Sequence, residues 1–372
     1  AKKIVIPATV KQIDFGGVNW GDKELEVAPG NPVYKVKNNI LYTADGKTVV
    51  FSSKQSGTVK IADGVKTIAG DAFHGSDLTA LELPKSLEKI EAGAFENCTK
   101  LRRIKVSAKN PYMMEKAGAL YTKNGKKLLY AGVAKGTLML PKKTTQIAAN
   151  AFYGNTTVEM VFIQGKMKKL AKKSLAFSRI KDVTLPDSLL EIEEGAFMYC
   201  SKLADVEIPK SVKKIGANAF DGCYELERVV LPKKLTTLEK ETFRNCYRLR
   251  KIDLPKSLRT IKAGTFESCG FNQLIIPKSV KSIGKNALQV TTKKLIFKGK
   301  NVPKIAKQNA CQYGKYAGNT DPDFDLGVVR LDYIDIQYPM QHGIGKVKVP
   351  AESTGKYKKA LKGKMEYREL EY

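Results

Sequence analysis

A repeat of about 22–23 residues constrains the fold of this chain more than any other feature. Pro186, Pro209, Pro232 and Pro255 lie 23 residues apart, and Pro277 follows after 22. Aligned on these prolines, each unit reads L-x-x-[VI]-x-[LI]-P-x-x-[LV]-x-x-I-x-x-x-A-F-x-x-C. This period indicates a solenoid, because a unit this short cannot bury its apolar side chains until a neighbouring unit stacks on it.

Ten units share the alignment, and a divergent eleventh spans residues 295–310. The proline position is filled by Pro7, Ala62, Pro84, Pro141, Gln164, Pro186, Pro209, Pro232, Pro255 and Pro277. Before each proline, the alternation of the motif directs residues such as Val206 and Ile208 inward and Glu207 outward. Such strands should pair in parallel and form a continuous β ribbon, with each strand ending at the proline.

An aromatic residue recurs eleven residues after the proline position. Phe220 is one example, and its equivalents are Phe73, Phe95, Phe152, Phe197, Phe243 and Phe266, with Leu175 and Leu288 in two further units. We expect these side chains to stack as a buried row.

Two units carry long extensions, over about residues 31–57 and 110–136, that resemble each other at a constant offset of 79. Asn31-Pro32 matches Asn110-Pro111, and Leu41-Tyr-Thr43 matches Leu120-Tyr-Thr122. Each extension contains Asp-Gly or Asn-Gly between β-prone runs, at residues 45–46 and 124–125, which favours a two-residue hairpin turn. We predict one β-hairpin projecting from the solenoid in each, and one duplicated module.

The unit L-P-x-S-[LV]-x-x-I-x-x-x-A-F-x-x-C resembles the leucine-rich repeat of the BspA-like bacterial surface proteins, also called the Treponema pallidum type. The N-P…L-Y-x-x-[DN]-G-K extensions and residues 349–357 also resemble accessories of that family. The resemblance covers roughly residues 1–310 and 346–360. It implies a leucine-rich repeat solenoid over 1–310, a C-terminal capping segment over 346–372, and an exported or surface-attached protein of bacteria used in adhesion, without catalysis. Residues 311–345 depart from the pattern and are predicted as an irregular insert.

The chain is strongly basic and has no membrane-spanning run. Lys and Arg total 65 against 37 Asp and Glu, a net charge of +28, which favours polyanionic partners such as nucleic acid, wall polymer, acidic glycan or acidic membrane. The longest apolar run, residues 128–134, is far shorter than the roughly 20 residues of a membrane helix. The chain begins within a repeat, so an export signal has been removed or never existed.

Five of the six cysteines occupy one slot, three residues after the stacked aromatic. They are Cys98, Cys200, Cys223, Cys246 and Cys269, and other units place Ser76, Asn155 and Ser178 there. A slot that accepts Cys, Ser or Asn favours a small side chain that bonds to backbone in a tight turn. We therefore predict buried free thiols rather than disulfides or a metal ladder. Cys311 lies outside the repeat.

The sequence offers little material for catalysis, cofactor binding or a metal centre. It has two histidines: His74 is interpreted as a solvated surface residue, and His342 lies in the insert. Asp205 and Glu207 are interpreted as two exposed strand residues rather than an acid–base pair. Asp321, Asp323 and Asp325 resemble the start of a calcium loop, but Leu326 stands where the loop needs glycine, so a solvated acidic loop is the default.

A ligand is expected on the exposed ribbon face or beside it. The outward strand positions mix both charges, which favours protein recognition, and they include Arg228, Arg250 and Lys251. Lysine repeatedly follows the proline, and the last four such residues should form a row, either to hold a polyanion or only to discourage edge association. The candidate ligand-binding residues are Arg228, Arg250, Lys251, Lys210, Lys233, Lys256 and Lys278. Tyr224 and Tyr247, on adjacent units, form an aromatic patch or merely stack on each other.

Three functions remain open at this level. The leading one is a non-enzymatic, surface or secreted, adhesin-like scaffold that binds a protein or glycan on a host or microbial surface. The alternative is a polyanion binder that uses the lysine row for wall polymer, sulfated glycan or nucleic acid. The third places a hydrolase site in residues 311–345.

Overall fold

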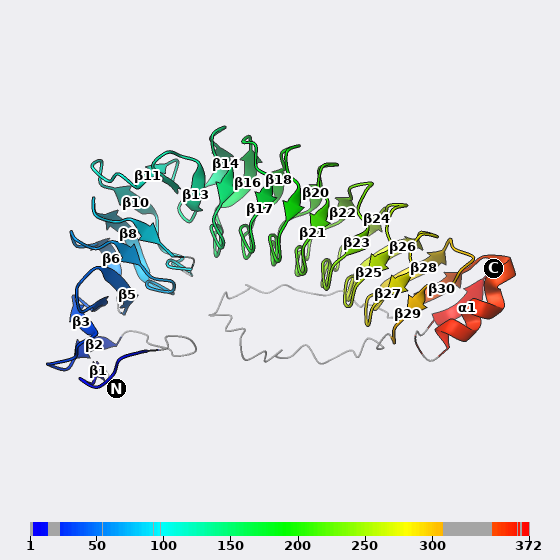
Figure 1. Ribbon diagram of the computed structural model, residues 1–372, viewed down its shortest axis with the longest axis horizontal. Coiled ribbons are helices and arrows are strands. Elements are labelled where there is room, and N and C mark those ends of the chain that lie inside the picture. Colours follow the sequence, from blue (N-terminus) through cyan, green and yellow to red (C-terminus); the bar gives the residue numbers. More distant parts are fainter. Residues whose placement is uncertain are drawn as a thin grey trace. The chain divides into compact units, whose positions relative to one another are not determined.

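The computed structural model describes residues 3–13, 23–53, 55–91, 93–96, 98–307, 344–362, 364 and 367–371. The chain forms two compact units. Among the described residues, the first unit comprises residues up to 135 together with 147–157, and the second comprises 136–146 and everything from 158 onward. Both units are parallel β-solenoids, which confirms the predicted fold class (Figure 1).

The predicted ribbon runs along one side of the second unit. Its strands are β14 (Gly136–Leu140), β16 (Val158–Ile163), β18 (Asp182–Thr184), β20 (Asp205–Glu207), β22 (Arg228–Val230), β24 (Lys251–Ile252), β26 (Gly270–Ile276), β28 (Thr291–Phe297), β30 (Ile344–Lys348) and β31 (Tyr367–Glu371). The pairing is parallel and in repeat register: Val206 lies opposite Val229, and both side chains are buried. The repeat length therefore places equivalent residues of successive coils side by side.

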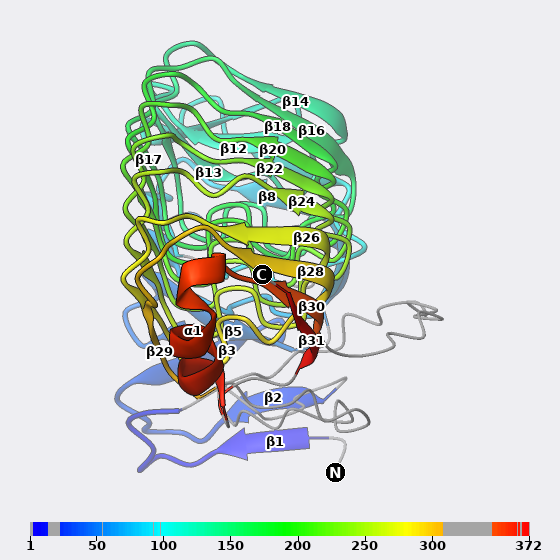
Figure 2. The ribbon, with the colours of Figure 1, turned by 90° about the vertical axis from the view of Figure 1, so that its right-hand side faces the viewer.

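A second row of two-residue strands runs along another side of the same coils. It consists of β17 (Lys169–Leu170), β19 (Glu191–Ile192), β21 (Lys214–Ile215), β23 (Thr237–Leu238), β25 (Thr260–Ile261), β27 (Ser282–Ile283) and β29 (Lys304–Ile305). Each strand contributes the buried isoleucine or leucine of the x-x-I part of the motif. Figure 2 shows β14, β16 and β18 on one side of the unit and β17 and β29 on another. The proline turn is the corner between the two rows.

The aromatic residues stack on the third side, inside the turns. The rings of Phe197, Phe220, Phe243 and Phe266 are at most 2 % exposed and lie nearly parallel, with centroid distances of 4.9, 5.4 and 5.9 Å. In the first unit Phe73 stacks on Phe95 at 5.7 Å. Leu175 and Leu288 fill the same slot and are also buried. The predicted aromatic row is therefore confirmed.

The first unit contains the same two kinds of strand. The ribbon strands are β1 (Lys3–Ile6), β2 (Glu24–Val27), β6 (Ser56–Lys60), β8 (Asp77–Leu83) and β10 (Arg103–Val106), and the short strands are β7 (Thr67–Ile68) and β9 (Lys89–Ile90). β1 pairs in parallel with β2, and β8 lies between β6 and β10. The sequence alignment assigned no coil to β2, because no proline or phenylalanine of the motif marks it.

The two extensions are three-stranded antiparallel meanders, not single hairpins. The first contains β3 (Tyr34–Lys37), β4 (Ile40–Thr43) and β5 (Thr48–Ser52), and the second contains β11 (Met113–Lys116), β12 (Ala119–Thr122) and β13 (Lys127–Tyr130), in a sheet with β15 (Gln146–Ile147). The tight two-residue turns fall at Asn38-Asn39 and Ala117-Gly118, where φ is positive at both residues.

The predicted turn at Asp45-Gly46 belongs to a longer loop between β4 and β5. Asp45 closes this loop, because its carboxylate accepts hydrogen bonds from the Thr43 hydroxyl and the Lys47 N–H, at 2.7 and 2.9 Å. β5 also pairs in parallel with β7. The extension is thus part of the solenoid wall, and the prediction that it projects from the solenoid was wrong.

Asn31 and Asn110, the first residues of the duplicated motif, clamp each meander to the preceding coil. The Asn110 side chain is buried; its Nδ2 donates to the carbonyls of Pro84 and Leu87, both at 2.9 Å. Its Oδ1 accepts from the N–H groups of Tyr112 and Met113, at 2.8 and 2.9 Å. Asn31 makes the equivalent bonds one module earlier. An asparagine is required there because only an amide offers both donors and an acceptor at that size.

Beyond the insert, the chain returns to the ribbon. β30 begins at Ile344, two residues before the predicted boundary at 346, and pairs in parallel with β28; β31 then pairs with β30. Between them lie η1 (Ala351–Ser353) and α1 (Thr354–Leu361). α1 buries Tyr357, whose ring packs on Phe297 at 5.2 Å and whose hydroxyl donates to the Gly299 carbonyl at 2.8 Å. In the described part of the chain, no helix is long and apolar enough to cross a membrane.

Replacing one ring of the aromatic row should destabilise the second unit strongly. Phe220→Ala removes a fully buried ring between two others, so we expect a loss of about 3–5 kcal/mol in the free energy of unfolding. Leu190→Ala, at a side chain that is 39 % exposed, serves as the control and should cost less than about 0.5 kcal/mol. Urea denaturation of both variants measures the difference. Equal losses would contradict a coil stack held by this row.

Candidate ligand-binding groove

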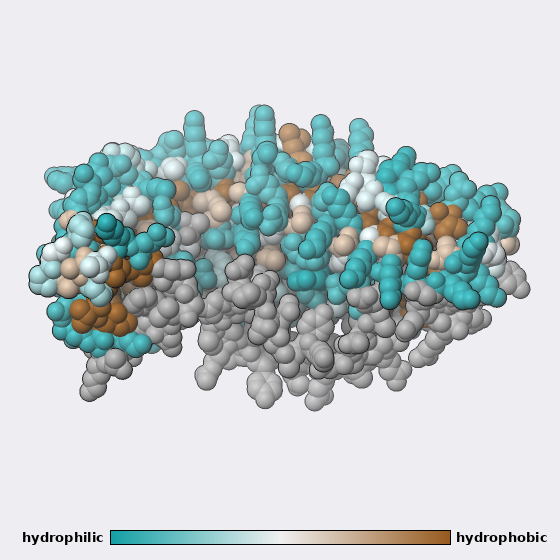
Figure 3. All heavy atoms as spheres, turned by 60° about the horizontal axis from the view of Figure 1, so that its bottom comes forward, coloured by the Kyte–Doolittle hydropathy of each residue, from teal (hydrophilic) through white to brown (hydrophobic). Residues whose placement is uncertain are grey.

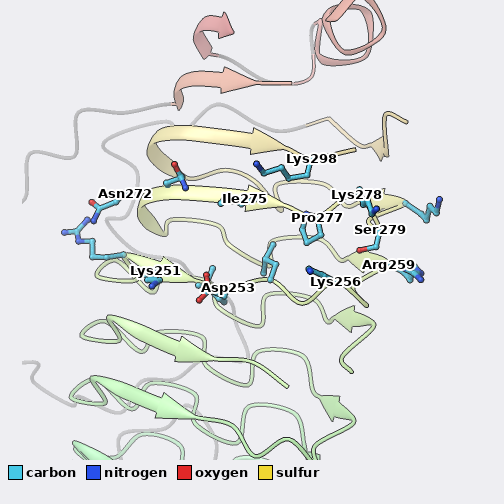
Figure 4. A pocket seen from close by; sticks show the side chains of 15 residues that line it. Lys251, Asp253, Lys256, Arg259, Asn272, Ile275, Pro277, Lys278, Ser279 and Lys298 are labelled. Atoms are coloured by element: carbon cyan, nitrogen blue, oxygen red, sulfur yellow. The ribbon is translucent and has the colours of Figure 1, made fainter. Parts of the chain in front are cut away.

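A groove of about 1080 Å³ lies on the second unit, over β24, β26 and the turns that follow them. Figure 4 shows Lys251 and Ile275 on strands β24 and β26, Asp253 directly after β24, and Lys256, Pro277 and Lys278 beyond the strand ends. The lining residues are Arg250, Lys251, Ile252, Asp253, Leu254, Lys256, Arg259, Asn272, Gln273, Ile275, Pro277, Lys278, Ser279, Lys281 and Lys298. Seven of these carry positive charge and only Asp253 carries negative charge, so the groove attracts anions.

The repeat places most of the cations at the corner between the ribbon and the second row. Lys256 and Lys278 follow the prolines of adjacent coils, and Arg259 and Lys281 stand four residues after those prolines, just before β25 and β27. Lys298 follows the end of β28. All five are exposed. Equivalent slots on neighbouring coils therefore bring two pairs of cations together.

Ion pairing distinguishes these cations from several lysines of the second row of strands. Glu191 pairs with both Lys169 and Lys214 at 2.8 Å, and Glu239 pairs with Lys262 at 2.6 Å. In contrast, none of the seven groove cations forms an ion pair with another described residue. Arg250 donates instead to the Gly270 carbonyl at 2.9 Å. The positive charge of the groove is not neutralised by the part of the chain that the structure describes.

Ser279 adds a polar group to the groove wall. The serine that follows the proline by two residues usually donates to a carbonyl of the preceding coil, as Ser211 does to Leu189 at 2.7 Å and Ser257 to Leu235 at 2.6 Å. The hydroxyl oxygen of Ser279 is buried but has no hydrogen-bond partner within the described residues. A buried hydroxyl without a partner is costly, so this atom is a ready contact for a ligand or water.

The structure separates the seven residues proposed from the sequence. Arg250, Lys251, Lys256 and Lys278 line the groove, and Lys210 and Lys233 occupy the post-proline slot on the preceding coils, outside it. Arg228 also lies outside, and its Nε is paired with the Asp205 carboxylate at 3.1 Å. Asp205 and Glu207 are both exposed residues of β20, as the sequence predicted.

Sequence reasoning missed three of the seven groove cations and the Ser279 hydroxyl. Arg259 and Lys281 share one slot at a spacing of 22, so the repeat itself carried a signal for them. The sequence carried no such signal for Lys298 or Ser279. Lys298 occupies the position of proline in the divergent unit. Ser279 differs from the other serines at its position of the repeat only by its missing hydrogen bond.

On the face that Figure 3 presents, hydrophilic side chains predominate and hydrophobic areas lie between them. The half-buried tyrosines do not form an open aromatic patch: Tyr224 and Tyr247 stack at 5.5 Å and 6°, and Tyr199 meets Tyr224 edge-on at 6.0 Å. Beside them, the buried carboxylate of Asp221 accepts hydrogen bonds from Arg244 Nε at 3.3 Å and from Asn245 Nδ2 at 3.1 Å. This polar cluster is satisfied internally and stabilises the turns.

The cysteine slot forms the predicted ladder of buried free thiols. Cys98, Cys200, Cys223, Cys246 and Cys269 are all free and buried. Each Sγ donates to the carbonyl of the aromatic slot in the preceding coil, at 3.0 to 3.2 Å. Burial raises the pKa of the Cys98 and Cys200 thiols to about 12. The bond reaches across coils, which the prediction of a bond within a tight turn did not foresee.

These thiols should be inert in the folded protein. Because the reactive species is the thiolate, a buried thiol with a raised pKa reacts slowly at pH 8. In a Cys311→Ser variant, which removes the thiol outside the ladder, we expect almost no reaction with Ellman's reagent until guanidinium is added. All five cysteines should then react. Fast reaction of several thiols in the folded state would contradict the ladder.

One cluster in the first unit has the composition of a metal site. Asp71, His74 and Glu96 each offer a ligand atom, and these atoms lie within 4.8 Å of one another. His74 Nδ1 is 3.8 Å from Glu96 Oε1, so His74 faces a carboxylate and is not simply solvated. The candidate calcium ligands Asp321, Asp323 and Asp325, together with His342, Cys311 and the hydrolase hypothesis for the insert, lie outside the described residues.

Comparison with known proteins agrees with the fold. A model of the BspA type leucine-rich repeat region matches residues 47–127, 66–191, 125–247 and 168–295. A leucine-rich repeat protein from Eubacterium ventriosum is 18 % identical, with a TM-score of 0.50 over 86 % of this chain and 80 % of that one. A leucine-rich cell surface protein from Faecalibacterium prausnitzii is 16 % identical, with a TM-score of 0.41 over 93 % of this chain and 96 % of that one. The pneumococcal vaccine antigen PcpA is 15 % identical, with a TM-score of 0.44 over 100 % of this chain and 78 % of that one. No curated protein matches the sequence.

The stacked coils, the parallel ribbon and the thiol ladder define a leucine-rich repeat solenoid that carries a basic groove. Since the family model spans more than half of the sequence, the chain belongs to the BspA type leucine-rich repeat family.

Proposed function

We propose that this chain is a non-catalytic binding scaffold at the bacterial cell surface or in the secreted fraction. It recognises a molecule of a host or microbial surface through the ribbon side of its second unit, in the manner of an adhesin. The observation that carries the proposal is the groove, where seven exposed cations form no ion pair with a described residue, whereas several lysines of the second row of strands are paired. Leaving so many charges uncompensated has no benefit for stability, because like charges repel.

The family supports the same conclusion. The resemblance to BspA-like surface proteins implies export and adhesion, and the repeat provides a rigid surface of exchangeable side chains. The described residues offer no arrangement of nucleophile, base and oxyanion donors in the groove, whose single acidic group is Asp253. Binding is therefore the activity that this geometry serves best.

The immobilised chain should retain a component of at least one surface preparation: host matrix proteins, mucins or bacterial envelope fractions. The double variant Lys256→Glu and Lys278→Glu should lose that retention, because it reverses charge inside the groove. The matched control, Lys142→Glu and Lys143→Glu, changes exposed lysines outside the groove by the same charge and should keep it. Mass spectrometry of the eluate identifies the component. Retention of nothing from all three preparations would overturn the proposal.

A second candidate is favoured by the same unpaired cations. Lys210, Lys233, Lys256 and Lys278 occupy the post-proline slot of four successive coils, and the last two line the groove. Such a row suits a polyanion, because binding releases the counterions that surround it.

Polyanion binding must be sensitive to salt. With inorganic polyphosphate as the probe, we expect the association constant to fall at least about tenfold between about 50 and 200 mM NaCl, because several counterions are released per complex. Fluorescence anisotropy with labelled polyphosphate measures this. An affinity that hardly changes across the series would exclude the electrostatic mechanism.

A further inference from the structure

We propose that the ligand of the groove is an anionic polysaccharide whose chain runs along the stacking axis, across β24, β26 and β28. This inference rests on the proposed function, since it names the ligand class of that binding side. Three features of the groove point to a charged sugar polymer: periodic cations, an apolar floor and neutral hydrogen-bonding groups.

The cations repeat with the coils. Lys256 and Lys278 are equivalent, Arg259 and Lys281 are equivalent, and Lys233 and Lys210 continue the first row beyond the groove. Stacked rings place successive coils about 5–6 Å apart, as the centroid distances of 4.9 to 5.9 Å between adjacent phenylalanines show. A linear polymer with a charge on each repeat unit matches such an array over its whole length. An acidic patch on a folded protein has no such period.

The floor between the cations is apolar. Ile275 is 36 % exposed on β26, and Leu254 and Pro277 line the same space. Sugar rings present apolar C–H faces as well as charged substituents, so this floor gives them contact area that charge alone does not. Inorganic polyphosphate has no apolar face and would leave Ile275 exposed.

Neutral polar groups complete the match. The amides of Asn272 and Gln273 are exposed, and the Ser279 hydroxyl is buried at the wall without a partner. Sugar hydroxyls both donate and accept, which is what amides and a hydroxyl require. Satisfying Ser279 gains a hydrogen bond and removes the cost of an unpaired buried group.

The same residues disfavour single-stranded nucleic acid. Proteins that bind it stack bases on aromatic rings, and the groove is lined by none. Five of its seven cations are lysines, which act as point charges and lack the planar fork with which arginine grips phosphate.

The test compares four probes at physiological salt by isothermal titration calorimetry: a heparin octasaccharide, its desulfated counterpart, polyphosphate of matched charge and oligothymidylate of matched charge. We expect the sulfated octasaccharide to bind at least about tenfold more tightly than each of the others, because only it satisfies cations, floor and hydroxyl together. Loss of binding on desulfation establishes the role of charge.

Two sets of variants locate the site. Lys256→Gln, Arg259→Gln, Lys278→Gln and Lys281→Gln combined should weaken octasaccharide binding at least about tenfold, since four local attractions are lost. The matched control combines Lys142→Gln, Lys143→Gln, Lys166→Gln and Lys168→Gln, four exposed lysines of the same unit outside the groove, and should change it less than about threefold. Ser279→Ala should weaken octasaccharide but not polyphosphate binding, by roughly threefold to tenfold. Circular dichroism confirms that each variant is folded.

The outcomes separate the two proposals. Equal affinity for the sulfated octasaccharide, polyphosphate and oligothymidylate, or equal effects of the two quadruple variants, would overturn the polysaccharide site and leave only general charge attraction. If the octasaccharide does not bind but the chain still retains a surface protein that Lys256→Glu and Lys278→Glu release, the ligand is an acidic protein and only this inference fails. If nothing is retained in either experiment, the proposed function fails with it.

Discussion

Each coil of this protein depends on its neighbour, and the remaining structure follows from that dependence. A unit of 22–23 residues has too little interior of its own, so its strands, its phenylalanine and its cysteine all find their partners one coil away. The thiol of Cys246 donates to the carbonyl of Phe220, while the ring of Phe243 lies 5.4 Å from that of Phe220. Register between coils is therefore fixed at several points of every turn.

Because the register is fixed, residues that are equivalent in the repeat lie side by side on the surface. Positions that face inward are restricted to one kind of side chain, whereas positions that face outward are free and reappear at the spacing of the coils. Where acidic and basic residues alternate in such positions, as at Glu191, Lys169 and Lys214, the charges form ion pairs. Where basic residues accumulate, as around Lys278 and Lys281, the same geometry concentrates charge into a groove.

The duplicated meanders show how the chain adds elements without breaking the stack. Asn31 and Asn110 each tie a meander to the proline turn before it, and β5 rejoins the parallel sheet at β7. In each copy, one amide side chain bonds two carbonyls of the proline turn and two N–H groups at the start of the meander. The asparagine makes the same bonds in both copies of the motif.

The fold was predictable because its determinants are local and repeated: the alternation before each proline, the phenylalanine and the small residue three positions later are all visible in a single unit. Where the determinants are not repeated, the prediction failed. The strands on either side of Asp45-Gly46 are present as β4 and β5, but strand β3, which pairs with β4 across Asn38-Asn39, was not predicted. The coil at β2 was missed because it lacks the proline and the phenylalanine of the motif.

The candidate site divides in the same way. The sequence by itself determined that lysines follow successive prolines and would stand in a row, because slot and spacing fix that much. Only the tertiary structure decided that Lys256 and Lys278 share a groove with Arg259, Lys281 and Lys298, that Arg228 is paired with Asp205, and that the Ser279 hydroxyl is left without a partner. The physical reason is that a position in the repeat fixes where the backbone of a residue lies on its coil. Ion pairing, burial and the shape of a groove depend on the side chains that neighbouring coils place around it.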